Sequence, residues 1–221
     1  MALQGLKSLF LMALILGSCA APGSDNPAQG CGGTEASVSC LEITSIAPVS
    51  AGGGGANASN VDAFREFCTD PTTGQVTFES FTDHNAAMSF SNMLFPTATT
   101  GFDIRVVGYS VSYGLNQCPA AALPCPMLTG FTVFGASILI PKGGAVTVTL
   151  PFVPLRTKSE FCTKKMGESA GFPSYTATYT FTAQTTGIND TFTVTGSAEF
   201  TIGDFVDSGF SCTGKVDFAG C

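Results

Sequence analysis

Tryptophan is absent from this chain of 221 residues, and histidine occurs once, at His84. No Cys-x-x-Cys pair and no Cys-x-x-Cys-His run occurs, and neither does an Asp-x-Asp-x-Asp-Gly loop. Structural zinc sites, iron–sulfur clusters, c-type haem attachment and calcium loops depend on such patterns. The sequence therefore predicts no metal centre and no cofactor.

Charge is also scarce. Charged residues make up 11% of the chain, and 9 Lys and Arg against 16 Asp and Glu give a formal net charge of −7. Nucleic-acid binding requires a basic patch, so this function class is excluded. The longest apolar stretch of the later chain, 131–152, is interrupted by Pro141-Lys142-Gly143-Gly144 and is not expected to cross a membrane.

The N-terminus has the pattern of an export signal. Lys7 precedes a short apolar run, 9–16, which is too short to span a bilayer. The run ends in Leu16-Gly17-Ser18-Cys19, which resembles the lipobox of bacterial lipoprotein precursors. The resemblance implies cleavage before Cys19, acylation of Cys19, and a lipid anchor in the bacterial outer membrane, at the cell surface or on its periplasmic face. An ordinary secretory signal cut near Ala20-Ala21 is the alternative.

These features divide the chain into three expected parts. Residues 1–18 are a lipoprotein signal peptide, and residues 19–37 are the lipid anchor with a flexible tether. Residues 38–221 are a single β-sandwich domain with a Gly-rich loop at 50–59.

Eight cysteines follow Cys19, and an even number in an exported chain indicates a disulfide framework. The sequence leaves their connectivity open. Loop lengths favour three local bridges and leave one long bridge between the remaining pair. The expected pairs are Cys31–Cys40, Cys118–Cys125, Cys212–Cys221 and Cys68–Cys162.

Alternating apolar and hydroxyl side chains dominate 175–202. Side chains on a strand have a period of two, so both halves of this stretch are expected to be strands with one apolar face. A two-residue turn at Gly187-Ile188 brings the two apolar faces together. It pairs Ala183 with Phe192, Phe181 with Val194, and Tyr179 with Gly196.

The rest of the chain also reads as β-structure. We expect further strands at 39–49, 75–81, 87–95, 102–113, 131–140 and 145–153, separated by residues that break strands. Pro151 indicates an edge strand or a bulge. The only helix expected is a short one at 60–67, capped by Asn60. About seven or eight strands at this spacing predict an all-β fold, an antiparallel β-sandwich with immunoglobulin-like Greek-key topology, and a β-barrel is the alternative.

Two groups of residues resemble catalytic motifs. The sequence Gly-Glu-Ser-Ala-Gly at 167–171 resembles the nucleophile elbow of carboxylesterases, but Pro173 lies where the helix should run and no His follows Ser169. Asp207-Ser208-Gly209, with His84 and Asp103 upstream, faintly resembles trypsin-like serine peptidases. Neither motif has its required context, and His84 is expected in an exposed turn. We therefore predict that the protein is not an enzyme.

The remaining function classes involve binding. The tyrosines share strand faces with apolar residues and are expected in the core, and the Thr-lined face of 175–202 is expected to be a solvated sheet. The sequence favours a non-catalytic structural or protein-interaction role in the cell envelope, with another envelope or extracellular protein as partner. A surface adhesin or glycan-binding module is the alternative, and an esterase-like hydrolase at 167–171 is a disfavoured third.

Overall fold

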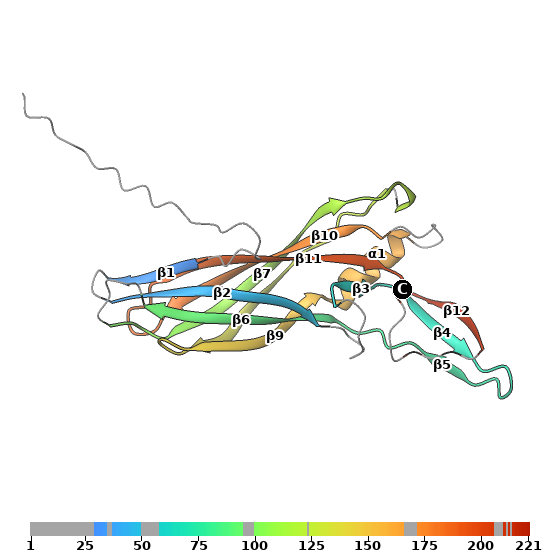
Figure 1. The fold of residues 1–221 in the computed structure, drawn as a ribbon, viewed down its shortest axis with the longest axis horizontal. Coiled ribbons are helices and arrows are strands. Elements are labelled where there is room, and N and C mark those ends of the chain that lie inside the picture. The colour runs from blue at the N-terminus through green and yellow to red at the C-terminus, as the bar shows by residue number, and fades with distance from the viewer. Residues whose placement is uncertain are drawn as a thin grey trace, which may run out of the picture.

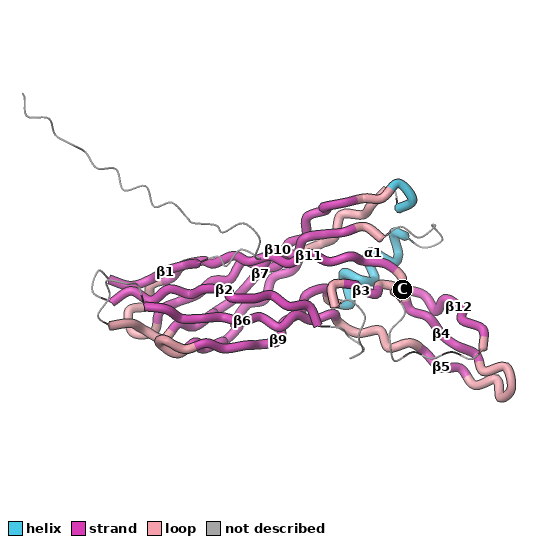
Figure 2. Tube along the Cα trace, in the orientation of Figure 1, coloured by secondary structure: helices cyan, strands magenta, loops and turns pink. Residues whose placement is uncertain are grey.

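The computed structural model of the chain describes residues 29–34, 37–49, 58–94, 100–122, 124–165, 172–205, 210, 212 and 214–221. The predicted signal peptide, the lipobox and the acylation site at Cys19 lie outside the described residues, as do residues 50–57 of the Gly-rich loop. The described chain consists mainly of strands, with one α-helix and one short 3₁₀ turn, Ala120–Ala122 (Figure 2). Within these ranges, no helix combines the length and apolar character needed to cross a membrane.

Two of the three sheets form an antiparallel sandwich, as predicted (Figure 1). The first sheet has the order β1-β2-β6-β9, with β1 Gln29–Thr34, β2 Ser37–Val49, β6 His84–Leu94 and β9 Ala145–Val153. The second sheet has the order β3-β11-β10-β7-β8, with β3 Asn60–Asp62, β7 Ile104–Gln117, β8 Phe131–Ile140, β10 Ser174–Thr185 and β11 Thr191–Gly203. The short β3 joins β11 in parallel, whereas the other pairings are antiparallel.

A third, small sheet was not expected. It has the order β12-β4-β5, with β4 Arg65–Thr69, β5 Val76–Phe78 and β12 Lys215–Gly220. Figure 1 shows it projecting beyond one end of the sandwich. The sandwich predicted for 38–221 thus carries an additional sheet.

The hairpin of β10 and β11 has the predicted register. Ala183 pairs with Phe192, Phe181 with Val194, and Tyr179 with Gly196. The turn is wider than predicted, because the N–H of Asn189 donates to the carbonyl of Thr185 at 3.1 Å. Gly187 has a positive φ of 100°, as the prediction required, but Asn189 also has a positive φ of 58°. The apolar pattern fixed the register, and the turn adapted to it.

The core lies between the two large sheets. Phe90 of the first sheet meets Phe181 of the second edge to face, with ring centroids 5.0 Å apart. Tyr179 and Tyr113 of the second sheet donate hydrogen bonds of 2.7 Å to the carbonyls of Pro151 and Phe152. Both carbonyls belong to β9, an edge strand of the first sheet as Pro151 predicted. Each tyrosine therefore fills the apolar core and satisfies a carbonyl of the opposite sheet.

The helix predicted at 60–67 is wrong. This segment forms β3 and β4, because β3 gains backbone partners from β11 and β4 from β12 and β5. The helix of the structure is α1, Leu155–Lys165, which begins after Pro154, and Asp83 Oδ1 accepts a hydrogen bond from the N–H of Leu155. Its buried face includes Lys158 and Lys165 beside Phe161, so its sequence does not show an apolar stripe.

Two of the four predicted disulfides are wrong. The bridges Cys31–Cys40 and Cys118–Cys125 are present as expected. The other four cysteines pair as Cys68–Cys212 and Cys162–Cys221, in place of Cys68–Cys162 and Cys212–Cys221. The antiparallel pairing of β12 with β4 explains both bridges. The start of β12 lies beside Cys68, so Cys212 reaches Cys68, and the end of β12 brings Cys221 to Cys162 of α1.

The predicted tether also needs correction. Residues 29–34, which fall within the range 19–37 assigned to a flexible tether, form β1 and pair with β2 in full register. The disulfide Cys31–Cys40 connects the same two strands. The small and polar residues of this segment give no strand pattern in the sequence. The strand forms through its pairing with β2 and through the disulfide.

Candidate functional site

The small sheet and α1 meet at one end of the molecule, and this junction carries the most distinctive surface of the described chain. Figure 1 shows α1 near the base of the projecting sheet. The two are connected covalently, because Cys162 of α1 forms a disulfide with Cys221, directly after β12.

One face of the small sheet is aromatic and exposed. Directly opposed residues of neighbouring strands lie on the same face, so Phe67 shares a face with Phe78, and Thr69 with Val76. Phe78 is 53% exposed and Val76 is 44% exposed. The rings of Phe67 and Phe78 lie 5.9 Å apart, and Arg65 Cζ lies 4.8 Å from the centroid of the Phe78 ring. We call Arg65, Phe67, Val76 and Phe78 the aromatic face.

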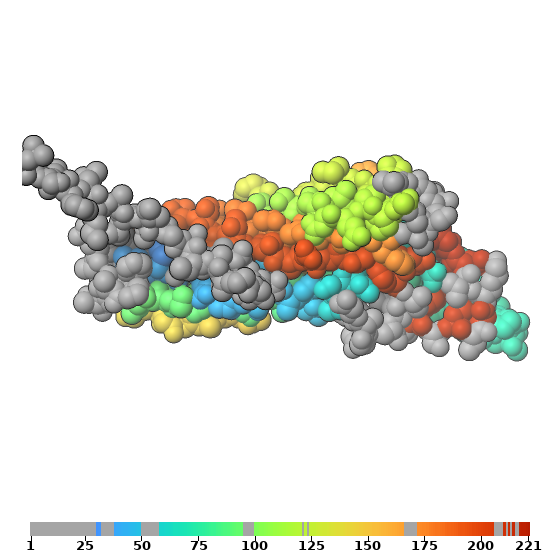
Figure 3. Space-filling model, turned by 45° about the horizontal axis from the view of Figure 1, so that its top comes forward, coloured from blue at the N-terminus to red at the C-terminus, as the bar shows by residue number. Residues whose placement is uncertain are grey.

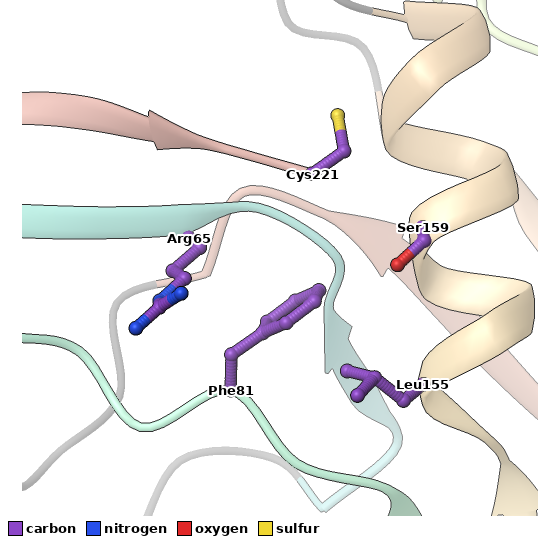
Figure 4. A pocket seen from close by; sticks show the side chains of 5 residues that line it. All are labelled: Arg65, Phe81, Leu155, Ser159 and Cys221. Atoms are coloured by element: carbon purple, nitrogen blue, oxygen red, sulfur yellow. The ribbon is translucent and has the colours of Figure 1, made fainter.

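A cavity continues the aromatic face toward the helix. It has a volume of about 310 Å³ and is lined by Arg65, Phe81, Leu155, Ser159 and Cys221. Figure 4 shows the side chains of Phe81 and Leu155 pointing toward one another from the segment after β5 and from α1. We call this cavity the end pocket. Because Arg65 belongs to both, the end pocket and the aromatic face form one surface.

Ionisable groups are buried beneath this surface. Asp62, Glu79, His84 and Lys158 are each 8% exposed or less, and we call them the buried polar cluster. Asp62 Oδ1 accepts hydrogen bonds of 3.2 Å from the N–H groups of Phe64 and Phe205. The Nζ of Lys158 lies 5.2 Å from the centroid of the Phe81 ring, which places it next to the end pocket.

Burial governs the protonation of these groups. The pKa of Asp62 is raised to about 8, mainly by burial and in smaller part by the nearby Glu79, against the opposing effect of two backbone N–H donors and Lys158. Burial lowers the pKa of His84, and Lys158 lowers it further. Near neutral pH the Asp62 carboxyl is therefore mainly protonated and the His84 ring is neutral.

Burial raises the pKa of two further carboxyls at the junction. The pKa of Glu66 lies above its usual value because of burial, and the nearby Asp204 and Glu79 add to the shift. The pKa of Asp204 is raised by burial as well. The junction thus holds several carboxyls whose charged forms are disfavoured.

The predicted catalytic residues do not assemble a site. His84 was expected in an exposed turn, but it is buried at the start of β6, and its Nε2 lies 2.8 Å from the carbonyl oxygen of Ala58. Asp103 instead accepts a hydrogen bond from the N–H of Lys142. The preceding residue, Phe102, contacts Asn92 near the other end of β6. His84 and Asp103 therefore lie toward opposite ends of this strand.

The serines of both motifs lie outside the described residues, as does Asp207. The Ser159 hydroxyl lines the end pocket, but His84, the chain's only imidazole, is occupied by a backbone carbonyl. In the ranges that the structure describes, no group of three or more His, Cys, Asp or Glu residues could hold a metal ion. The aromatic face and the end pocket can bind an apolar group beside the cationic side chain of Arg65, and the buried carboxyl of Asp62 can hold a proton.

No protein-family model, no curated protein and no solved structure matches the chain. The function is therefore argued from the surface itself.

Proposed function

We propose that this protein is a lipid-anchored protein of the bacterial cell envelope with a non-catalytic role, which binds another envelope or extracellular protein through the aromatic face and the end pocket. The observation that carries this proposal is the exposure of Phe78 beside a cavity of about 310 Å³. Contiguous exposed apolar surface next to a cavity is typical of protein-interaction sites.

The chemistry of the partner follows from the residues of this surface. An apolar side chain of the partner would enter the end pocket between Phe81 and Leu155, because central anchors in pockets supply most of the energy of an interface. Arg65 lies at the boundary of pocket and face and would contact an acidic group of the partner. The exposed ring of Phe78 would be covered by the partner's apolar surface.

The order of the strands supports an immunoglobulin-like Greek key. Strands β2-β6-β9 form one sheet and β8-β7-β10-β11 form the other. This arrangement corresponds to the A-B-E and C′-C-F-G strands of immunoglobulin-like sandwiches. The corresponding fold is a common scaffold for binding at cell surfaces, although function must still come from a particular surface.

The lipid anchor rests on the lipobox at Leu16-Gly17-Ser18-Cys19, and four disulfides agree with an oxidising compartment. We expect Cys19→Ser to prevent acylation, so that the variant is not labelled when cells are fed radioactive palmitate. Wild-type protein should carry the label and partition into detergent. Labelling of the Cys19→Ser variant to the same level would refute the anchor.

The docking surface is tested by substituting its exposed residues. We expect Phe78→Ser to weaken binding of the partner at least tenfold, because the partner covers this ring. The measurement is recovery of chemically crosslinked envelope proteins with tagged full-length chain, followed by affinity measurement with the protein recovered. Leu115→Ser is the control, because Leu115 lies on β7, is 38% exposed and lies outside the aromatic face and the end pocket. If both variants recover the partner equally well, the aromatic face is not the docking surface.

The alternative function, an adhesin or glycan-binding module, is favoured by the exposed ring of Phe134 and by a cavity at Arg105, both on the second sheet. The esterase-like alternative gains no support from the described residues, because residues 167–171 lie outside them.

A further inference from the structure

The outer face of the second sheet carries its own group of binding side chains. Threonines at 178, 180 and 182 line the outward side of β10, and Figure 3 shows β10 and β11 as an orange-to-red strip along the molecule. At the end where this hairpin turns, the hydroxyl pattern gives way to other residue types. Leu139, Arg105 and Gln184 oppose one another across β8, β7 and β10.

An exposed phenylalanine lies beside this row. Phe134 pairs with Gly108, which in turn pairs with Thr182, so the Phe134 side chain is on the same outward face. Phe134 is 88% exposed, because Gly108 offers no side chain to cover it. Gly135, with a φ of 70°, follows it where the register between β7 and β8 shifts. The ring therefore stands free on the sheet surface, where a flat ligand can reach it.

A small cavity lies at Arg105 and Gln184. Its volume is about 230 Å³, and its walls are formed by Arg105, Gln184, Thr185, Thr186, Gly187 and Asn189. The positive φ angles of Gly187 and Asn189 curl the hairpin turn around one side of it. Ligand pockets for drug-sized molecules usually measure about 300–1,000 Å³, so this cavity suits a single small ring.

Arg105 supplies the charge of the site. Its side chain is exposed, and no hydrogen bond or ion pair joins its guanidinium to another residue in the part of the chain that the structure describes. The neighbouring Asp103 has a carboxylate oxygen that accepts the N–H of Lys142. An unengaged guanidinium presents a planar pair of donors that matches a carboxylate.

We propose that this site binds a carboxylated saccharide, such as a uronic acid residue of an acidic glycan. Arg105 binds the carboxylate, and the side-chain amides of Gln184 and Asn189 hydrogen-bond ring hydroxyls. Phe134 stacks against the apolar C–H face of an adjacent sugar, and the threonines of β10 line the path of the remaining chain. This inference goes beyond the proposed protein docking, because it uses a different surface.

The test is titration of the full-length chain with an oligogalacturonide trimer, followed by calorimetry and by NMR. We expect saturable binding that weakens at least tenfold, or about 1.4 kcal/mol, in Arg105→Gln and in Phe134→Ser. Both residues are exposed, so the variants are expected to fold, which circular dichroism checks. Arg156→Gln, a substitution of an exposed arginine on α1, is the matched control and should bind like wild type.

Three results would overturn the proposal. Equal binding of neutral maltotriose, with no effect of Arg105→Gln, would remove the role of the carboxylate. Equal or tighter binding of a tetraglutamate peptide would make the site a peptide site. The absence of any binding at millimolar trimer would exclude a saccharide site. Because Phe78→Ser should leave trimer binding unchanged, failure of this proposal is distinguishable from failure of the protein docking.

Discussion

Asp62→Asn is expected to stabilise the protein at alkaline pH and to remove much of the pH dependence of its stability. In the folded protein the pKa of Asp62 is raised by burial to about 8, whereas its usual value is 3.8. The folded state therefore holds this proton over a pH range in which the unfolded chain has released it. The contribution of Asp62 to the free energy of unfolding is therefore full below about pH 4, and it is lost as the pH rises toward 8.

The size of this effect follows from the two pKa values. A shift of about four units corresponds to about 5 kcal/mol between the two ends of the range. Asparagine can keep the side-chain oxygen that accepts the N–H groups of Phe64 and Phe205. We therefore expect the fall in the free energy of unfolding between pH 4 and pH 9 to shrink by about that amount in Asp62→Asn.

Urea unfolding of wild type and variant at a series of pH values measures this difference directly. Glu66 and Asp204, whose pKa values are also raised, act in the same direction as Asp62 and remain in both proteins. His84 acts oppositely, because its lowered pKa costs stability only as the pH falls below about 6.5. Glu199→Gln, on the exposed face of β11, is the control. Parallel pH profiles of wild type and Asp62→Asn would contradict the burial of this carboxyl.

Removing the disulfide Cys68–Cys212 is expected to have a comparably large effect. The bridge joins residues separated by 144 positions, so it restricts the unfolded chain strongly. Chain-entropy arguments give a loss of about 5 kcal/mol in the free energy of unfolding for Cys68→Ser with Cys212→Ser. The loss should show most strongly in the small sheet, because Cys68 lies in β4.

The matched comparison is the bridge Cys118–Cys125, whose sequence separation is 7. Replacing both of these cysteines by serine should cost only about 2 kcal/mol, because the loop it closes is short. Equilibrium unfolding of the two double variants measures both values. Equal losses would show that loop length does not determine the stabilisation, and a larger loss for Cys118–Cys125 would reverse the expected order.

The sequence predicts the sandwich well where one strand face is apolar along its whole length. The alternation in 175–202 predicts the strands and the pairing of Tyr179 with Gly196, which the structure confirms. The strands at 131–140 and 145–153 also begin and end as predicted. In these segments burial of one face decides both structure and register, so the pattern alone is sufficient.

Elements that depend on distant partners could not be predicted in this way. β3 and β4 contain residues of an apparent short helix, and only their pairing with β11 and β12 makes them strands. The same pairing decides the disulfides Cys68–Cys212 and Cys162–Cys221. α1 was missed because Lys158 and Lys165 are buried on it: Lys158 lies over the Phe81 ring, and Lys165 donates to the carbonyl of Ala122.

The candidate site was missed for a related reason. The sequence indicates a strand at 75–81, but not that Phe78 is exposed, since phenylalanines usually lie in the core. The small sheet leaves this ring without a covering layer. The buried polar cluster likewise joins residues from β3, β6, α1 and the segment after β5, which are far apart in the sequence.

The central claim is that the aromatic face binds a protein partner, and site-specific photo-crosslinking in living cells tests it most directly. A photoreactive amino acid is placed at position 78, and in a second strain at position 195 on the outward face of β11. We predict that position 78 forms a crosslink to one recurrent envelope protein and that position 195 does not. The same products from both positions, or none from position 78, would contradict the claim.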